Sequence, residues 1–154
     1  MRVVVQRVSR AKCVVNKEVI SEIEKGLMLL VGFEENDDLS LDFDYFAKKI
    51  ASLRIFSDQD DKLNLSVKDI GGSILCISQF TLYGDVRKGN RPSFTKAKNY
   101  NEANILYEKF VEKLNLHVRT LKGSFGSDMA IDFVNDGPVT ILIDSDDWKW
   151  KYDY

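Results

Sequence analysis

The sequence predicts an α+β fold in which a mainly antiparallel sheet, open or closed into a barrel, carries two main helices on its outside. Segments typical of strands outnumber helical segments by about seven or eight to two. They do not alternate regularly with helices, which argues against a parallel β-α-β architecture. The chain of 154 residues contains no linker, repeat or low-complexity tract. Residues 1–154 are therefore expected to form a single domain.

Strands are expected where β-branched, aromatic and aliphatic residues form short runs. These runs are residues 2–8, 11–15, 18–23, 27–33, 53–56, 73–82, 117–121, 129–134 and 139–144. Asn16-Lys17 predicts a hairpin turn, and the pattern alone predicts another at residues 135–138. The almost uncharged run 73–82 (SILCISQFTL) is expected to be buried on both faces of the sheet.

Two segments have the spacing of amphipathic helices. The first is residues 43–53, with an apolar face formed by Phe43, Phe46, Ala47, Ile50 and Leu53. Asp38 or Ser40 is expected to cap its start. The second helix is residues 101–116, with Asn101 as the expected N-cap. The closing segment DDWKWKYDY is interpreted only as a tail or an edge cover.

Composition excludes several classes of protein. Apolar content of 44% and charged content of 30% are typical of a soluble globular domain. No apolar run approaches the roughly 20 residues that span a bilayer, and the N-terminus does not resemble a signal peptide. We expect no membrane contact. Cys13 and Cys76 are expected to be buried reduced thiols, which predicts a cytoplasmic protein. With one histidine, His117, neither a metal site nor a cofactor is expected.

Positive charge is concentrated in one segment, residues 86–98, which contains no acid. Its cations are Arg87, Lys88, Arg91, Lys96 and Lys98, and without them the net charge of −2 becomes −7. Such a segment can bind phosphates, although a solvated surface loop is an equally good interpretation. Gly84 and Gly89 have the spacing of a nucleotide-binding P-loop. Asn90-Arg91 stands where that motif requires Lys and Ser/Thr, which excludes it.

The polar residues Ser78, Gln79 and Thr81 interrupt the apolar run 73–82. An unpaired buried hydroxyl or amide costs about 1–3 kcal/mol, so these residues either cap a turn or line a site, and we favour the site. A nucleophilic serine or threonine needs a neighbouring base, and His117 alone provides no obvious one. Asp85 and Asp128 could form an acid pair, but the chain is rich in acids. Residue types therefore favour oriented backbone donors and substrate assistance, which suit an activated ester.

The segments Ser78-Gln79-Phe80-Thr81-Leu82 and Asn135-Asp136-Gly137-Pro138-Val139-Thr140 resemble the SQFTL and NxGPxT motifs of the D-aminoacyl-tRNA deacylases. The similarity covers nearly the whole chain. It includes QRV at residues 6–8, NLSV at 64–67, Gly71-Gly72, G-x-R-P-S-F at 89–94 and SFG at 124–126. Ser127 stands where the family usually has alanine, and the residues after Asp144 have no counterpart in the family pattern.

The resemblance implies a homodimer that hydrolyses the ester between a D-amino acid and the 3′ end of tRNA. Whether glycyl-tRNA is also a substrate is left open. Gly137 and Pro138 would share a cis peptide bond, enter the pocket of the partner subunit and screen chirality. Arg7 would brace this dipeptide.

The resemblance also assigns the remaining roles. The catalytic residues would be Ser78, Gln79, Phe80 and Thr81, with Phe125 and Met129 completing the pocket for the amino acid and the terminal adenosine. Thr81 could be a nucleophile, but without a base we prefer a positioning role, with the 2′-hydroxyl of the tRNA terminus assisting. Independently of the resemblance, the charge of the basic segment predicts that Arg87, Lys88 and Arg91 bind the tRNA phosphates.

Two other functions compete with this one. A non-catalytic nucleic-acid-binding module could use the basic segment, with Tyr83 and Phe94 stacking on bases. It leaves Ser78, Gln79 and Thr81 unexplained. A small-molecule esterase would not need the basic segment.

Overall fold

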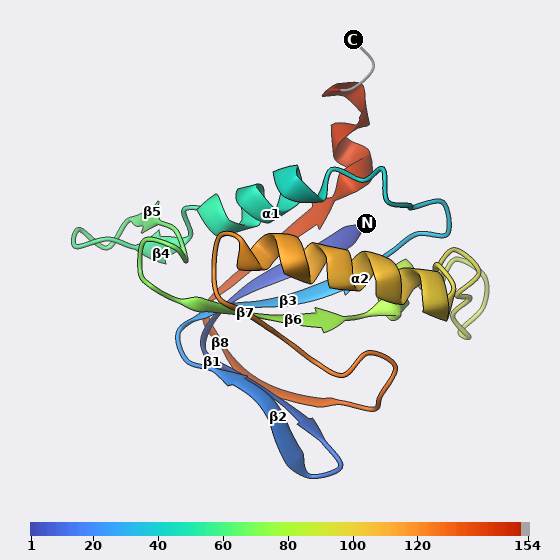
Figure 1. The fold of residues 1–154 in the computed structure, drawn as a ribbon, viewed down its shortest axis with the longest axis horizontal. Coiled ribbons are helices and arrows are strands. Elements are labelled where there is room, and N and C mark those ends of the chain that lie inside the picture. The colour runs from blue at the N-terminus through green and yellow to red at the C-terminus, as the bar shows by residue number, and fades with distance from the viewer. Residues whose placement is uncertain (152–154) are drawn as a thin grey trace.

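The computed structural model describes the backbone of residues 1–151 and the side chains of residues 1–148. The chain forms, in order, β1 (Arg2–Val15), β2 (Glu18–Ile23), β3 (Gly26–Gly32), α1 (Phe43–Ser52), β4 (Phe56–Ser57), β5 (Leu63–Leu65), β6 (Ser73–Ser78), the 3₁₀ turn η1 (Phe80–Tyr83), α2 (Tyr100–Asn115), β7 (Thr120–Lys122), β8 (Ala130–Asp144) and the 3₁₀ helix η2 (Ser145–Lys151). Figure 1 labels the strands and the two α-helices.

The main sheet is mixed. Its order is β2-β1-β3-β6-β7, and β8 pairs with β1. The pairs of β1 with β2, β3 and β8 are antiparallel, whereas β3–β6 and β6–β7 are parallel. The α+β class is confirmed, with more parallel pairing than the sequence predicts. The connections explain this, because α1 lies between β3 and β6 in the chain and α2 lies between β6 and β7, as parallel pairing requires.

The long strand β1 curves the sheet towards a barrel. Its residues 2–8 pair with β3, its residues 11–15 pair with β2, and β8 follows most of its other edge. β2 thereby approaches β6 and β7. The curved sheet encloses a small apolar cluster, which is separate from the main core under the helices. Its buried members are Val8, Ala11, Cys13, Ile23, Met28, Leu75 and Ile77. The predicted hairpin is present, and Asn16 and Lys17 both have positive φ, as its tight turn needs.

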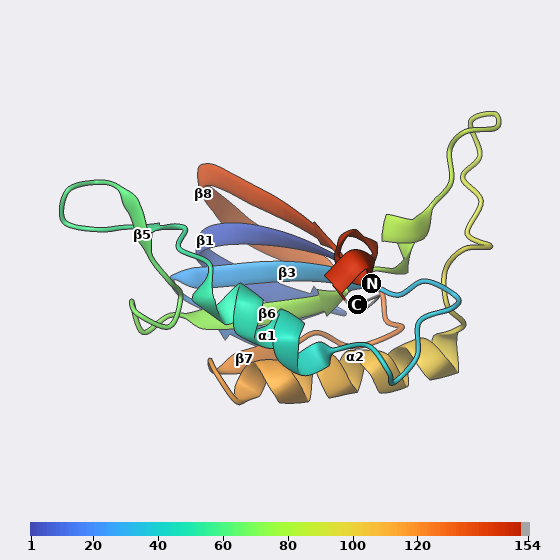
Figure 2. The ribbon, with the colours of Figure 1, turned by 90° about the horizontal axis from the view of Figure 1, so that it is seen from above.

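Both helices lie on the other face of the sheet (Figures 1 and 2). There Phe46 and Ile50 of α1 and Phe110 and Leu114 of α2 are buried in the main core. The predicted N-caps are wrong. Asp42 caps α1, because Asp38 is used in a turn with Ser40 before the helix begins. Asn99 caps α2 by accepting from the amide of Glu102, which leaves Asn101 inside the first turn.

Several predicted strands differ from the structure. The strand expected at residues 53–56 is only the two-residue β4 (Phe56–Ser57). β6 ends at Ser78, and the rest of the expected strand is η1. β7 begins at Thr120, because the amides of His117 and Val118 still bond to Leu114 at the end of α2. Residues 130–144 form one strand, since both halves pair with β1 in the same direction. The predicted hairpin turn at residues 135–138 is therefore wrong.

The closing segment covers α1. Trp148 in η2 donates from Nε1 to the hydroxyl of Tyr45 at 3.0 Å, and its ring packs against Phe46 with centroids 5.6 Å apart. Residues 152–154 lie outside the described part of the chain. Cys13 and Cys76 are buried free thiols, as predicted. Within the described residues, no helix is long and apolar enough to cross a membrane.

Candidate active site

A pocket of about 550 Å³ opens where the parallel strands β3 and β6 end. The carboxyl ends of neighbouring parallel strands are a common place for ligand sites. The structure brings five of the predicted site residues together here. The lining includes Ser78, Gln79, Phe80, Phe125 and Met129.

The η1 turn holds the motif residues at the pocket edge. The amide of Gln79 donates to the carbonyl of Val31 at 2.7 Å, which ties the start of η1 to β3. Gly32 permits this approach, because a Cβ there would lie 2.7 Å from the carbonyl oxygen of Gln79. Within the turn, the side chain of Gln79 donates from Nε2 to Thr81 Oγ1 at 2.5 Å. Phe80 and Thr81 are exposed, so the prediction that the whole segment is buried in a strand is wrong.

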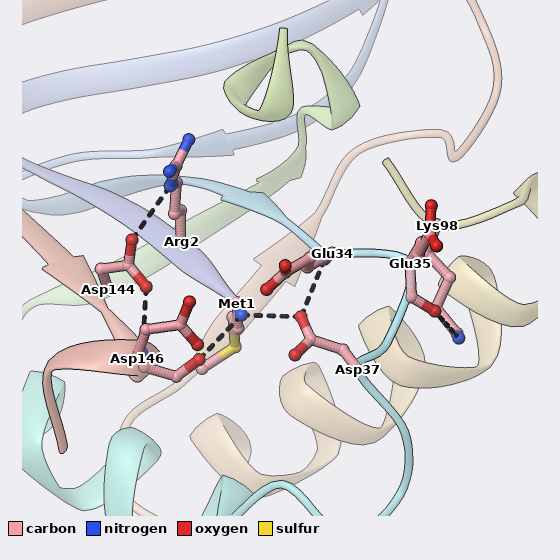
Figure 3. Close-up of polar contacts among 9 residues, drawn as sticks. Met1, Arg2, Glu34, Glu35, Asp37, Lys98, Asp144 and Asp146 are labelled. Atoms are coloured by element: carbon pink, nitrogen blue, oxygen red, sulfur yellow. Dashed lines mark hydrogen bonds and ion pairs between the residues drawn. The ribbon is translucent and has the colours of Figure 1, made fainter. Parts of the chain in front are cut away.

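Arg2 anchors the far end of the same turn. Its Nη1 donates to the carbonyl of Leu82 at 2.9 Å, and its guanidinium lies 4.5 Å from the ring centroid of Tyr83. Its Nε donates to Asp144 at 3.0 Å (Figure 3). Nothing in the sequence pattern distinguishes Arg2 from other charges at strand ends. Burial raises the pKa of the neighbouring Tyr83 hydroxyl, which excludes that group as a base near neutral pH.

The Met1 ammonium, beside Arg2, fixes the start of β1. It is fully buried and donates to Asp37 at 2.6 Å and to the hydroxyl of Ser145 at 2.8 Å (Figure 3). The Asp37 carboxylate also accepts from the amide of Glu34 at 2.8 Å. These bonds join the first strand, the loop after β3 and the start of η2 beside η1.

Phe125 is held by two aromatic residues of α2 that the sequence pattern does not assign to the site. Its ring centroid lies 5.0 Å from that of Tyr100 and 5.6 Å from that of Tyr107. The Tyr107 hydroxyl donates to the carbonyl of Cys76 at 2.6 Å, which fixes this aromatic wall to β6. Ser127, the departure from the family pattern, hydrogen-bonds Ser124 within the same loop at 2.7 Å.

Lys98 and Asp128 are the charged residues of the pocket lining, and the described lining contains no histidine. His117 lies beyond the end of α2. Asp85 is outside the lining and is bound by Arg87, so the acid pair considered from the sequence is not assembled here. Among the residues that the structure describes, no group of three or more His, Cys, Asp or Glu side chains could hold a metal ion.

The Gly137–Pro138 segment is an exposed bulge of β8. The peptide bond between the two residues is cis. Gln6 pairs with Thr140 and Val8 with Asn135, so residues 136–139 lie opposite Arg7 alone. The motif residues Asn135 and Thr140 close the base of this bulge with a side-chain hydrogen bond of 3.1 Å.

Arg7, on the neighbouring strand β1, holds the bulge in place. Its Nε donates to the carbonyl of Asp136 and its Nη1 to the carbonyl of Ile55, both at 2.9 Å. Gly137 has φ +127°, and a Cβ there would lie 2.7 Å from Arg7 Nη2. A side chain at residue 137 would be both strained and obstructed. Arg7, Gly137 and Pro138 are not part of the pocket lining in their own chain.

The basic segment projects beyond the sheet (Figure 2). Asp85 and Ser93 exchange backbone hydrogen bonds of 2.7 and 2.9 Å at its base. Arg87 binds Asp85 through two side-chain hydrogen bonds, which hold the pKa of that carboxyl well below its usual range. Lys88 and Arg91 are exposed, and neither forms an ion pair within the described part of the chain.

The two aromatic residues considered for base stacking are exposed to different extents in the structure. Tyr83 is only 4% exposed, so it cannot stack on a base. Phe94 is 40% exposed and contacts Phe80 with ring centroids 5.2 Å apart. The basic segment is thus attached to the pocket edge through Phe94.

Solved structures share this fold. The chain superposes with a TM-score of 0.86 on "c-Myc DNA Unwinding Element Binding Protein", at 40% identity and covering 94% of this chain and 98% of that one. It also resembles "a probable eukaryotic D-amino acid tRNA deacylase", with a TM-score of 0.80, 92% and 97% coverage, and 17% identity. The second likeness is one of fold alone.

Sequence comparison names the family. The model described as "D-Tyr-tRNA(Tyr) deacylase" matches residues 4–144. Relatives named D-aminoacyl-tRNA deacylase are 53% identical in Staphylococcus haemolyticus, over 97% of this chain and 99% of the relative, and 53% in Clostridioides difficile, over 94% and 97%. A third, from Thermotoga petrophila, is 52% identical over 94% and 97%. The chain therefore belongs to the D-aminoacyl-tRNA deacylase family, as the motifs predict.

Proposed function

We propose that this chain hydrolyses the ester that joins a D-amino acid to the 3′ end of tRNA, in the pocket beside η1. Water is consumed, and a free D-amino acid and a tRNA with its terminal hydroxyl are released. The observation that carries this assignment is the convergence of Ser78, Gln79, Phe80, Phe125 and Met129 on one pocket in a chain of this family. The same pocket would take the terminal adenosine.

The backbone of η1 is suited to stabilise the tetrahedral intermediate. Its first amides, those of Phe80 and Thr81, have no acceptor within the turn, and Gln79 makes no side-chain cap over them. Two amides at such a position can donate to the oxyanion that forms during ester hydrolysis, which is often the largest catalytic contribution. We assign the oxyanion site to these two amides, with Ser78 on the adjoining wall.

Thr81 has a positioning role in this scheme. Its hydroxyl already accepts a hydrogen bond from Gln79, and the described lining contains no histidine to remove its proton. A threonine nucleophile would need such a base. Water is therefore the nucleophile, assisted by the 2′-hydroxyl of the terminal adenosine.

Chirality is screened by a second copy of the chain. Within the described residues β8 pairs with β1 alone, and it exposes the apolar side chains of Val134, Ile141 and Leu142 around the bulge. A long apolar edge strand is normally covered by a partner. In a two-fold dimer each subunit can place Gly137 and Pro138 in the other's pocket. Main-chain atoms there would exclude an L side chain but leave room for glycine, so glycyl-tRNA is a second expected substrate.

The basic segment would hold the tRNA body through Lys88 and Arg91, with Arg87 contributing less because Asp85 already binds it. Since charged tRNA is used in translation, we place the reaction in the cytoplasm.

Incubation with D-tyrosyl-tRNA and L-tyrosyl-tRNA tests the proposal. Loss of the D ester alone is expected. Hydrolysis of both would contradict the chirality screen. Binding without hydrolysis would instead favour a nucleic-acid-binding module, and equal turnover of simple D-amino acid esters would favour a small-molecule esterase.

A further inference from the structure

Phe94 is the residue through which the basic segment contacts the η1 turn. Its ring packs edge-to-face with that of Phe80, with centroids 5.2 Å apart and planes at 69°. The same ring lies against Gly84, where an added Cβ would stand 3.1 Å from Phe94 Cε1. Phe80 is the first residue of η1, and Gly84 is its C-cap. One side chain from outside the turn therefore contacts both of its ends.

The backbone on both sides of Phe94 is fixed. Directly before it, Ser93 exchanges the two backbone hydrogen bonds with Asp85 that close the base of the basic segment. Two residues after it, the carbonyl of Lys96 accepts from the amide of Glu35 at 2.8 Å. Glu35 lies in the loop after β3, so this second bond joins the Phe94 region to the main sheet and not to η1. Phe94 can therefore act as a fixed support for the turn.

The turn is open on the side that Phe94 contacts. Phe80 is 56% exposed, and Thr81 is exposed as well. The other ties of η1 act on its backbone, at Gln79 before the turn and at Leu82 within it. The direction of the Phe80 and Thr81 amides depends on the tilt of the turn about these two points. A misplacement of about 1 Å can cost roughly 100-fold in rate, so a support for this tilt matters for catalysis.

We propose that Phe94 is a positioning residue of the reaction, and that it holds η1 at the tilt at which the amides of Phe80 and Thr81 face the ester carbonyl. This inference rests on the proposed function. It gives Phe94 a different task from the neighbouring cations, which would bind the tRNA body. A ring that is 40% exposed can also stack on a base of the tRNA, but the two roles predict a different dependence on the substrate.

The ester of D-tyrosine with adenosine separates these roles, because it has the reacting bond without the tRNA body. Phe94→Ala should lower kcat about tenfold on this minimal ester and on D-tyrosyl-tRNA, with KM within about twofold for each. Phe94→Tyr keeps the ring and should recover most of the rate, and Phe94→Leu, which keeps apolar bulk, should fall between them. Val86→Ala is the matched control, since Val86 is 67% exposed in the same segment, and it should behave as wild type.

Amide hydrogen exchange supplies a second readout that does not use the reaction. The amides of Leu82 and Gly84 donate to carbonyls within the η1 region, at 3.3 and 2.9 Å. In Phe94→Ala both should exchange about tenfold faster, because the turn opens more often when its support is removed. The amide of Ile74, in the buried strand β6, should exchange at the wild-type rate, which shows that the core is intact.

Three results would overturn the proposal. They are wild-type kcat of Phe94→Ala on the minimal ester, a rise in KM on D-tyrosyl-tRNA at constant kcat, and unchanged exchange at Leu82 and Gly84. The second would show that Phe94 stacks on the tRNA. A wild-type chain that hydrolyses neither ester would refute the proposed function, and the exchange of the two amides would still decide whether Phe94 supports η1.

Discussion

The pocket and the Gly137–Pro138 bulge are built in opposite ways on the same sheet. The pocket is a concavity at the ends of β3 and β6, and its walls are fixed by buried strands and by the aromatic residues of α2. The bulge is a convexity on β8 that is held up by Arg7 and exposed at its tip. Neither Gly137 nor Pro138 lines the pocket of its own chain, and in the proposed dimer the bulge of one chain would enter the pocket of the other.

The two regions are held in place by different contacts. In the proposed chirality screen the main-chain wall must stay in place, and Arg7 would hold it with its two hydrogen bonds to carbonyls on different segments. The pocket gains its rigidity from the core. The η1 turn at the pocket edge is fixed at both ends, by Val31 and by Arg2.

The largest effect is expected from Gly137→Ala. The added side chain would strain a backbone conformation that L residues rarely adopt, and its Cβ would meet Nη2 of Arg7, so either the bulge or the Arg7 side chain that braces it must shift. A displacement of about 1 Å can cost roughly 100-fold in rate, and we expect a loss of that order in kcat/KM for D-tyrosyl-tRNA. Gly71→Ala is the matched control, because Gly71 also has positive φ but open space around it. Wild-type activity in Gly137→Ala would contradict the role of the bulge.

Thr81→Ala should have an intermediate effect. If the hydroxyl only positions Gln79, turnover should fall about tenfold and binding of charged tRNA should survive. Thr81→Ser should recover most of the rate, and single-turnover kinetics measure both variants. Complete inactivity, together with a trapped aminoacyl-enzyme on the native chain, would show that Thr81 is the nucleophile.

Substitutions in the basic segment should have a smaller effect, and they should not change the selection of D over L substrates. Alanine at Lys88 and Arg91 should weaken binding of every tRNA and flatten the dependence of log K on log salt by about 0.7–0.9 for each phosphate that is no longer bound. Adding Arg87→Ala should change the slope little, since Asp85 occupies its guanidinium. The ratio of D to L activity should stay constant. A collapsed ratio with an unchanged slope would place the segment in the acyl pocket.

The smallest effect concerns Asp85. Arg87 lowers its pKa in the folded chain, so its contribution to stability is present above the unfolded pKa of about 3.9 and is lost as the pH falls through the folded value. Arg87→Ala should raise the pKa of Asp85 towards its ordinary value, as measured by NMR titration of the carboxyl carbon. An unchanged pKa would mean that the pair is not formed in solution, and that Arg87 is free for tRNA.

Short sequence patterns were sufficient to predict much of the fold. The Asn16-Lys17 turn and both amphipathic helices follow from patterns within a few residues. Parallel pairing of β3 with β6 is a tertiary property that no short pattern contains. The apolar character of residues 80–83 could not distinguish a strand from η1, because Tyr83 is buried in both cases.

The site shows the same division. The resemblance to the family motifs predicted which residues meet at the pocket. Ser78 to Phe80 belong to one short motif, and Phe125 and Met129 lie close together in a second segment, so each group could be found from sequence. Arg2, Tyr100 and Tyr107 support the site from distant elements, and only their contacts identify them. The bulge resembles a hairpin in sequence, because Asn-Asp-Gly-Pro has turn chemistry whether or not the strand reverses.

A mixed dimer tests most directly whether the pocket of one chain works with the bulge of another. One subunit would carry Gln79→Ala with Thr81→Ala, and its differently tagged partner would carry Gly137→Ala, so that each homodimer is strongly impaired. The purified heterodimer combines one intact pocket with the intact bulge of the other subunit. It should recover about half of the wild-type activity on D-tyrosyl-tRNA, as one good site of two requires. Activity no higher than the mean of the two homodimers would show that pocket and bulge do not meet across subunits.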